Sequence, residues 1–163
     1  MKILLVYYSL EGNTEFTANM IHEATQCDVL RLEPVNEPPK GFGRLITGGR
    51  QALTGEEPEL IAYDTDPTEY DTIIIGTPIW AGTYAPAIRT FLSRHELEGK
   101  NIYLFACSNS GNGEKALDKL TDILGKKNNV FDTLNLKAPL KYPNKALIQT
   151  RRFATKILGD EAR

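Results

Sequence analysis

The sequence predicts an α/β domain in which helices cover both faces of a parallel β-sheet. Short apolar runs of strand length alternate along the chain with segments whose apolar residues recur at helical spacing, the pattern of β-α-β units. The runs are nearly continuously apolar, and strands of that kind are buried on both faces. Polar loops follow three of these runs directly, at the position where open parallel sheets bind ligands.

Each predicted element rests on this alternation. The five predicted strands are Lys2–Tyr8, Val29–Leu32, Asp71–Gly76, Asn101–Cys107 and Val130–Leu136. The four predicted helices are Asn13–Ala24, Ala85–Arg94, Gly113–Leu124 and Asn144–Leu158. In the first helix, for example, Phe16, Met20 and Ala24 recur on one face, as a helix packed against a sheet requires.

Length and composition favour one globular domain spanning residues 1–163. The chain is 41% apolar and 25% charged and has a net charge of −2, so nucleic acid is not an expected partner. Its apolar runs are too short to span a membrane, and no membrane partner is expected either. Two cysteines, Cys27 and Cys107, do not make a disulfide framework, and no signal peptide is recognised; both observations favour the cytoplasm.

Two features interrupt the even pattern. Residues 1–70 hold 5 Lys or Arg and 12 Asp or Glu, whereas residues 71–163 hold 14 and 9, which indicates a lopsided surface charge. The stretch at about 34–70 is rich in Pro and Gly and is long for a connection inside a compact domain. We interpret it as an elaborated crossover that carries a flap, with a weak helix around Arg44–Leu53.

The loop after the first strand has the chemistry of a phosphate site. It reads Ser9-Leu10-Glu11-Gly12-Asn13-Thr14, and it leads directly into a helix. Hydroxyls and the free N–H groups of a helix start are donors that a phosphate needs, and a flexible glycine lets the backbone turn these donors toward it. No Lys or Arg and no Walker motif is present, which favours one terminal phosphate over a triphosphate. A plain helix cap is the alternative, because Asn and Thr are common N-caps.

The other two loops offer a flat surface and a polar edge. The second, residues 77–84, reads Thr-Pro-Ile-Trp-Ala-Gly-Thr-Tyr, and its Trp80 is predicted as an exposed plane for a flat ligand, with ordinary packing as the alternative. The third, residues 107–113, reads Cys-Ser-Asn-Ser-Gly-Asn-Gly and suits the edge of a heteroaromatic ring. Gly111–Ala116 also matches a dinucleotide fingerprint, which we disfavour because its first glycine lies four residues beyond Cys107.

Together the loops describe a phosphate site, a planar sandwich and a polar rim, which is the shape of a flavin mononucleotide (FMN) site. The chain resembles the flavodoxin family in three motifs: Ser9-x-x-Gly12-Asn13-Thr14, Gly76-Thr77-Pro78-Ile79-Trp80-Ala81-Gly82 and Ser108-Asn109-Ser110-Gly111-x-Gly113. The resemblance covers nearly the whole chain. It implies a three-layer, doubly wound, five-stranded parallel sheet in the order 2-1-3-4-5, with FMN as the cofactor.

The resemblance also implies which residues meet each part of the cofactor. The phosphate would be held by Ser9, Glu11, Gly12, Asn13 and Thr14. The ribityl chain would meet Thr77 and Pro78, and the ring would be bordered by Ile79, Trp80 and Gly82. The residues that would face the pyrimidine edge of the ring or close the pocket are Ser108, Asn109, Gly111 and Gly113. No catalytic side chain and no metal ligand are expected, because the flavin supplies the redox chemistry.

Two functions remain open at this point. One is an electron shuttle between redox partner proteins; the other is an FMN-dependent oxidoreductase that uses NAD(P)H to reduce a quinone or another small acceptor. The family's carriers are usually strongly acidic and often cover the flavin with an aromatic residue, where this chain has Asn109 and Asn112. An acidic rim around the flavin would favour the shuttle. A basic, open pocket with Arg44, Arg50 or Arg89 would favour the enzyme. The shuttle is favoured, as a monomer or homodimer.

Overall fold

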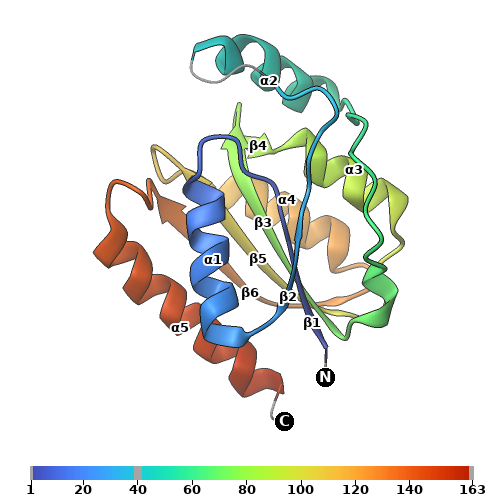
Figure 1. The fold of residues 1–163 in the computed structure, drawn as a ribbon, viewed down its shortest axis with the longest axis vertical. Helices are drawn as coiled ribbons and strands as arrows, with labels where there is room; N and C mark the ends of the chain where they lie inside the picture. Colours follow the sequence, from blue (N-terminus) through green and yellow to red (C-terminus); the bar gives the residue numbers. More distant parts are fainter. Residues whose placement is uncertain (1, 39–41, 162–163) are drawn as a thin grey trace.

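The computed structural model describes residues 2–38 and 42–161. Within these residues, five parallel strands lie in the order β2-β1-β3-β5-β6, and the short β4 pairs antiparallel with β3 (Figure 1). The strands are β1 (Ile3–Tyr7), β2 (Asp28–Arg31), β3 (Thr72–Trp80), β4 (Thr83–Tyr84), β5 (Asn101–Ser108) and β6 (Asn129–Lys137). The helices are α1 (Asn13–Thr25), α2 (Phe42–Thr54), the 3-10 turn η1 (Pro67–Glu69), α3 (Pro86–Arg94), α4 (Glu114–Leu124) and α5 (Pro143–Glu161).

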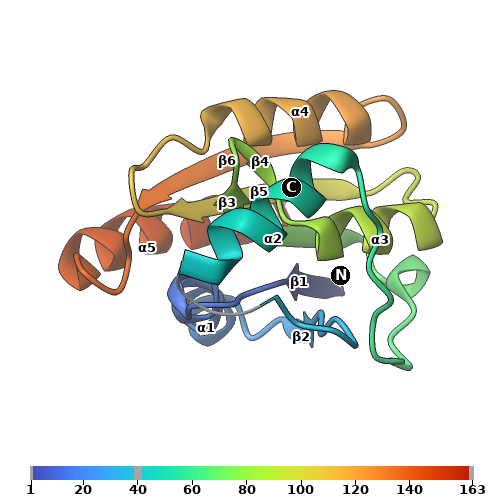
Figure 2. The same ribbon diagram turned by 90° about the horizontal axis from the view of Figure 1, so that it is seen from above.

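This arrangement confirms the predicted fold. Apart from β4, which the sequence pattern did not indicate, the strand order is the predicted 2-1-3-4-5, with β5 and β6 as the fourth and fifth parallel strands. Helices α1 and α5 cover one face of the sheet and α3 and α4 cover the other (Figure 2). Among the described residues, no helix has both the length and the apolar character needed to cross a membrane.

Alternate residues of the central strands supply the two halves of the core. In β1, Leu5 and Tyr7 join the cluster under α1 and α5, whereas Leu4 and Val6 join the cluster under α3 and α4. In β3, Gly76 allows the Phe105 ring to pack against the backbone, since a Cβ there would lie 2.1 Å from that ring. Any larger residue at position 76 would displace the centre of the core.

Burial on both faces holds only for the central strands. Residues of β1, β3 and β5 are almost all buried, as predicted, but most residues of β2 and β6 are not. Val29 is 43% exposed and Phe131 is 49% exposed. The prediction is wrong for these two strands because they are the edges of the sheet, where the helical layers end.

The flap region contains the predicted helix, and that helix is longer than expected. Helix α2 lies above the carboxyl ends of the strands, next to β4 (Figure 1). Its Ala52 is buried in the core, and a Cβ on Gly49 would lie 3.8 Å from Ala81. The Arg89 guanidinium of α3 donates to the carbonyls of Ala52 and Glu56, which ties the carboxyl end of α2 to the body of the domain.

Candidate functional site

A cavity of about 310 Å³ opens at the carboxyl ends of β1, β3 and β5. This volume lies at the small end of the range for ligand pockets, which is roughly 300–1,000 Å³. Its walls come from the three predicted loops. The lining residues are Ser9, Leu10, Glu11, Asn13, Thr14, Pro78, Ile79, Trp80, Ala81, Gly82, Cys107, Ser108, Asn109, Ser110 and Asn112.

The β1–α1 loop presents hydrogen-bond donors to this cavity. Gly12 has φ +94°, a left-handed conformation that glycine adopts without strain, and its N–H donates to the Ser9 hydroxyl at 3.2 Å. The Thr14 hydroxyl is buried and has no hydrogen-bond partner among the described residues. Thr14 lies in the first turn of α1, where backbone N–H groups have no partner within the helix and the helix dipole is positive. This end of the cavity therefore suits an anion.

The cavity walls carry little charge. Glu11 is the one acidic lining residue, and no Lys or Arg lines the cavity in the part of the chain that the structure describes. Arg31 braces the β1–α1 loop instead: its guanidinium donates to the Glu15 carboxylate at 2.6 Å and to the Ser9 carbonyl at 3.5 Å. An anion bound here would be held by neutral donors, as the sequence predicts.

The second wall is a hairpin and not an open loop. Strand β3 continues through Trp80, and β4 pairs back onto it, with Trp80 opposite Thr83 and Ile79 opposite Tyr84. Ala81 has φ +48° and Gly82 has φ +76°, the two positive values of a type I′ turn. The prediction that residues 77–80 form a loop is wrong, because Thr77 and Pro78 still pair with β5 and residues 79–80 pair with β4.

Trp80 is buried rather than exposed. Its side chain is 5% exposed and meets the Tyr8 ring edge to face, with the ring centres 5.4 Å apart. The prediction of an exposed aromatic plane is therefore wrong, and the packing alternative is right. Trp80 still borders the cavity, and its buried indole N–H has no hydrogen-bond partner among the described residues.

Thr77 is a supporting residue and does not line the cavity. It is fully buried, and its hydroxyl accepts from the Ala85 N–H at 2.9 Å and donates to the Pro78 carbonyl at 2.8 Å. These two bonds join the base of the hairpin to the segment that begins α3. The Thr77 hydroxyl thus serves the hairpin, and the contact of Thr77 with the ribityl chain stays a prediction.

The third wall, the β5–α4 loop, satisfies much of its own hydrogen bonding. The Gly111 N–H donates to the Ser108 hydroxyl at 2.9 Å, and Ser110 donates to the Asn112 side chain. Asn135 of β6 donates to the Gly111 carbonyl at 2.7 Å and accepts from the Gly113 N–H at 3.2 Å. Neither Gly111 nor Gly113 lines the cavity: both lie behind it, against Asn135 and Lys137.

Cys107 forms part of the cavity lining between these walls. Its side chain is 2% exposed, and its sulfur lies 3.5 Å from the Thr17 hydroxyl. Burial raises the pKa of the Cys107 thiol to about 12, because the thiolate would be desolvated. Cys107 is therefore protonated at neutral pH and does not act as a nucleophile there.

The structure brings together most of the predicted site residues. Ten line the cavity: Ser9, Glu11, Asn13, Thr14, Pro78, Ile79, Trp80, Gly82, Ser108 and Asn109. Four do not: Gly12, Thr77, Gly111 and Gly113. Five further lining residues were missed: Leu10, Ala81, Cys107, Ser110 and Asn112. Each missed residue is adjacent in sequence to a predicted site residue. This adjacency is the one feature of the sequence that could have identified them as lining residues.

The doubly wound sheet and the three-walled cavity at its carboxyl edge define an α/β protein of the flavodoxin-like class. The sequence profile of the family described as Flavodoxin matches residues 51–137, more than half of the chain. The chain therefore belongs to the flavodoxin family, as its motifs predict. The matched region contains the second and third walls of the cavity.

Two solved structures illustrate the shared fold. A flavoprotein from Lactobacillus acidophilus NCFM in complex with FMN has a TM-score of 0.71 and 20% identity, over 88% of this chain and 97% of that chain. Oxidised Flavodoxin 2 from Bacillus cereus has a TM-score of 0.66 and 18% identity, over 98% of this chain and 99% of that chain. Both likenesses support the topology in which the cavity lies.

The residues of the cavity fit FMN, the cofactor that the family implies. The unpartnered Thr14 hydroxyl and the start of α1 suit a phosphate at one end. Pro78 and Ile79 provide an apolar middle, and Ser108 and Asn109 provide a polar far wall. The arrangement of donors, apolar surface and polar edge follows the order of the phosphate, the flat ring and the polar pyrimidine edge of FMN.

Proposed function

We propose that this chain binds FMN in the three-walled cavity and shuttles electrons between redox partner proteins. The observation that carries the proposal is the juxtaposition of a neutral anion site at Thr14 with an apolar wall and a polar edge in one cavity. FMN, when bound, supplies the redox chemistry, and the protein supplies binding, orientation and electrostatics.

The lining residues have separate tasks in this proposal. Ser9 and Thr14 would donate to the phosphate together with the N–H groups of α1. Pro78 and Ile79 would exclude water from the ring. Because no Lys or Arg lines the cavity in the described part of the chain, the phosphate charge would stay unneutralised. That charge disfavours further negative charge on the flavin and so lowers its potential.

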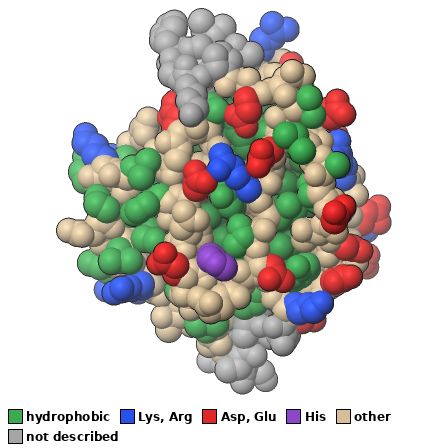
Figure 3. Space-filling view, in the orientation of Figure 1, with side chains coloured by type: hydrophobic (Ala, Val, Ile, Leu, Met, Phe, Trp, Pro, Cys, Tyr) green, Lys and Arg blue, Asp and Glu red, His purple; other side chains and the backbone are tan. Residues whose placement is uncertain are grey.

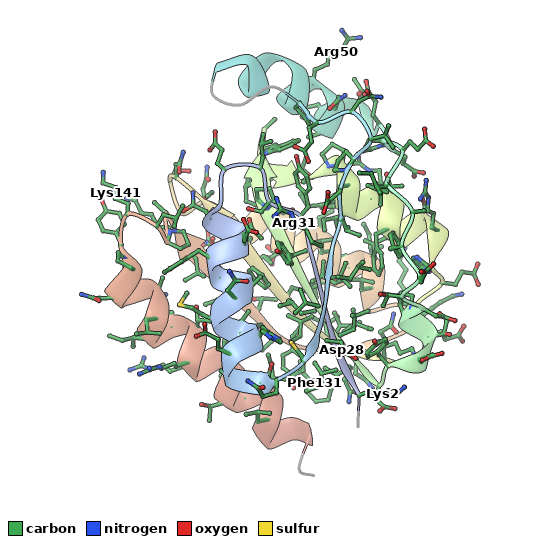
Figure 4. The ribbon with its side chains drawn as sticks, viewed as in Figure 1. Lys2, Asp28, Arg31, Arg50, Phe131 and Lys141 are labelled. Atoms are coloured by element: carbon green, nitrogen blue, oxygen red, sulfur yellow. The ribbon has the colours of Figure 1, made fainter. Side chains whose placement is uncertain are left out.

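The distribution of charge supports the carrier over the reductase. Arg89 is engaged by α2 and by the Tyr84 ring, and Arg50 points outward from α2, away from the cavity (Figure 4). The Arg44 side chain lies outside the described residues. A groove next to the cavity is lined by Glu33, Glu37 and Arg31, and the Arg31 guanidinium pairs with Glu15. Figure 3 shows Lys or Arg side chains flanked by Asp or Glu side chains near the centre of this face. The two carboxylates of this groove favour a protein docking partner over an anionic dinucleotide substrate on this side of the cavity.

One observation favours the alternative, an FMN-dependent NAD(P)H oxidoreductase. Asn109 and Ser110 are exposed at the third wall, and no aromatic side chain of that loop lies over the cavity. A small acceptor could approach the flavin from this side. The near-neutral net charge of −2 is also atypical of the family's carriers.

A spectral titration separates the two functions. The purified chain is loaded with FMN, and its visible spectrum is followed under anaerobic conditions after addition of NADPH or NADH, and then of dithionite. Bound flavin that ignores both nucleotides, yet is reduced by dithionite in two one-electron steps, supports the carrier. Prompt bleaching by either nucleotide supports the oxidoreductase. A colourless protein that does not take up FMN contradicts both.

A further inference from the structure

The turn between β6 and α5 lies at the edge of the cavity. We call residues 137–145 the rim segment. The Leu140 N–H donates to the Asn13 side chain at 3.1 Å, and a Cβ at Gly12 would lie 3.4 Å from Leu140 Cδ1. At the other end, a Cβ at Gly111 would lie 3.0 Å from Lys137 Cβ. The rim segment thus touches the first and third walls, and Figure 4 shows Lys141 at the same end of the molecule as these loops.

The rim segment combines exposed apolar groups with positive charge. Leu140 is 51% exposed and Tyr142 is 42% exposed. The Lys141 ammonium lies 5.4 Å from the centre of the Tyr142 ring, and Lys145 follows on the exposed side of α5. None of the three lysines of the segment forms an ion pair with a described residue. Their charge is therefore available to a partner.

The sequence around the rim segment contains no compensating charge. Residues 137–145 contain three Lys and no Asp or Glu. The neighbouring groove, which shares Ser9 and Leu10 with the cavity, is lined by Glu33 and Glu37 together with Arg31. Although the net charge is only −2, the positively charged rim segment and the groove with Glu33 and Glu37 both lie beside the same cavity. Charges separated in this way steer partners of opposite sign to different sides of the entrance.

The rim segment is also rigid enough to serve as a docking surface. Its turn is anchored by the Ala138 N–H, which donates to the Ser108 carbonyl at 2.8 Å, and by the Tyr142 N–H, which donates to the Ala138 carbonyl at 3.0 Å. A tyrosine and a leucine bordered by cations resemble the apolar centre and polar rim of protein interfaces. Because the backbone of the turn is already anchored, it would lose little conformational entropy on binding.

We propose that the rim segment docks a redox protein through an acidic patch on that partner. The inference rests on the proposed electron-carrier function and identifies one partner class by its charge. Lys137, Lys141 and Lys145 meet the partner's carboxylates, while Leu140 and Tyr142 supply the apolar contact. Because the segment touches two cavity walls, a partner bound there stands next to the flavin site. A second copy of this chain and an anionic membrane are the other occupants that the test must separate.

The test measures binding of an acidic probe to the full chain, with and without FMN. The probe is a fluorescein-labelled peptide of repeated Glu-Glu-Leu units, followed by fluorescence anisotropy. Because three attractive charges become repulsive, Lys137→Glu/Lys141→Glu/Lys145→Glu should weaken binding by about tenfold or more at low salt. The control Lys126→Glu/Arg151→Glu/Arg152→Glu changes the net charge equally, away from the rim, and should weaken binding by less than about threefold. Circular dichroism and thermal melts verify that both variants fold.

Three results would overturn the proposal. Equal weakening by the two triple variants would mean that the probe senses overall charge. Dissociation of a dimer by the rim variant in sedimentation would assign the surface to a second copy. Binding to phosphatidylserine vesicles that the rim variant abolishes, without an effect on the peptide, would assign it to a membrane. The titration involves no electron transfer, so a chain that fails the spectral test as a carrier can still pass this one.

Discussion

The first and third walls of the cavity differ in how they use their hydrogen-bonding groups. In the β5–α4 loop, the Ser108 hydroxyl and the Asn135 side chain engage the backbone of Gly111 and Gly113. In the β1–α1 loop, the buried Thr14 hydroxyl has no partner in the described structure. One wall supplies much of its own hydrogen bonding without a ligand, whereas the other leaves a buried polar group that a ligand can satisfy.

This difference indicates where binding energy comes from. A buried hydroxyl without a partner costs stability, and a ligand that accepts its hydrogen bond recovers that cost. The third wall gains less, because the Ser108 hydroxyl and the Asn135 side chain already bind its backbone at Gly111 and Gly113. Affinity is therefore expected to depend on the first wall, and the shape of the cavity on the third. Substitutions in the separate walls test this difference.

Replacing Thr14 by Val should give the largest change in affinity. The substitution removes the unpartnered hydroxyl and keeps the side-chain shape. Because hydrogen bonds to charged groups contribute about 1.5–3 kcal/mol, the dissociation constant for FMN should rise by about tenfold to a hundredfold. The free energy of unfolding of the FMN-free protein should stay the same or increase. Fluorescence titration with FMN and urea unfolding measure the two quantities.

Thr17→Val is the matched control for this prediction. Thr17 is equally buried in α1, but its hydroxyl donates to the Asn13 carbonyl and touches the Cys107 sulfur. Its loss should lower stability slightly and leave FMN affinity unchanged. If Thr17→Val weakened FMN binding as much as Thr14→Val, the hydroxyl of Thr14 would have no special role and the comparison between the walls would fail.

Replacing Asn135 by Leu should affect stability more than affinity. The change leaves the Gly111 carbonyl and the Gly113 N–H without their partner, which should lower the free energy of unfolding by about 1–3 kcal/mol. Asn128→Leu is the control, since Asn128 bridges Lys100, Leu97 and Leu124 away from the cavity. Both variants should melt earlier, but only Asn135→Leu should also alter FMN affinity, and by less than Thr14→Val.

The turn of the second wall should be improved by Ala81→Asn. Ala81 has φ +48°, where alanine is strained, and Asn-Gly is the preferred pair for a type I′ turn. The variant should gain about 0.5–1 kcal/mol in chemical unfolding. Gly82→Ala, at φ +76° with no atoms within 4 Å of its added Cβ, should lose a similar amount from backbone strain alone. Opposite signs for neighbouring positions would support the turn assignment; equal signs would count against it.

The walls also differ in how well the sequence predicts them. The first wall is local: residues 9–14 follow one strand and begin one helix, so the residues that approach a ligand are consecutive. The third wall depends on Asn135, which is 22 residues from Gly113 along the chain. No pattern within residues 107–113 indicates that Gly111 and Gly113 face Asn135 and Lys137 instead of the cavity.

The second wall shows a different limit. A loop was predicted after Gly76 because Pro78, Ala81 and Gly82 interrupt the apolar run. The turn lacks the Asn-Gly or Asp-Gly pair that usually marks a hairpin, so the two residues of β4 gave no local signal. The burial of Trp80 depends on Tyr8, which precedes the first wall. Such contacts arise from tertiary packing, which a single sequence does not display.

The smallest expected effect is a pH dependence that lies away from both walls. His95 ends α3 and hydrogen-bonds through Nε2 to the Tyr63 hydroxyl at 2.8 Å. Burial lowers the pKa of His95 below its ordinary value; the negative charge of Asp66 opposes this shift and Arg94 adds to it. A lowered pKa in the folded state means that His95 contributes stability above the unfolded pKa of about 6.5 and loses that contribution as the pH falls.

Thermal melts of the FMN-free protein should therefore show a small decrease in stability between about pH 7.5 and pH 5, which His95→Gln reduces. Asp66, whose pKa is lowered by hydrogen bonds from Thr68, titrates at lower pH and does not share this window. Thr14→Val should keep the full pH dependence, since its hydroxyl belongs to the cavity and not to this cluster. A pH dependence that vanished in Thr14→Val would instead place the titrating group in the first wall.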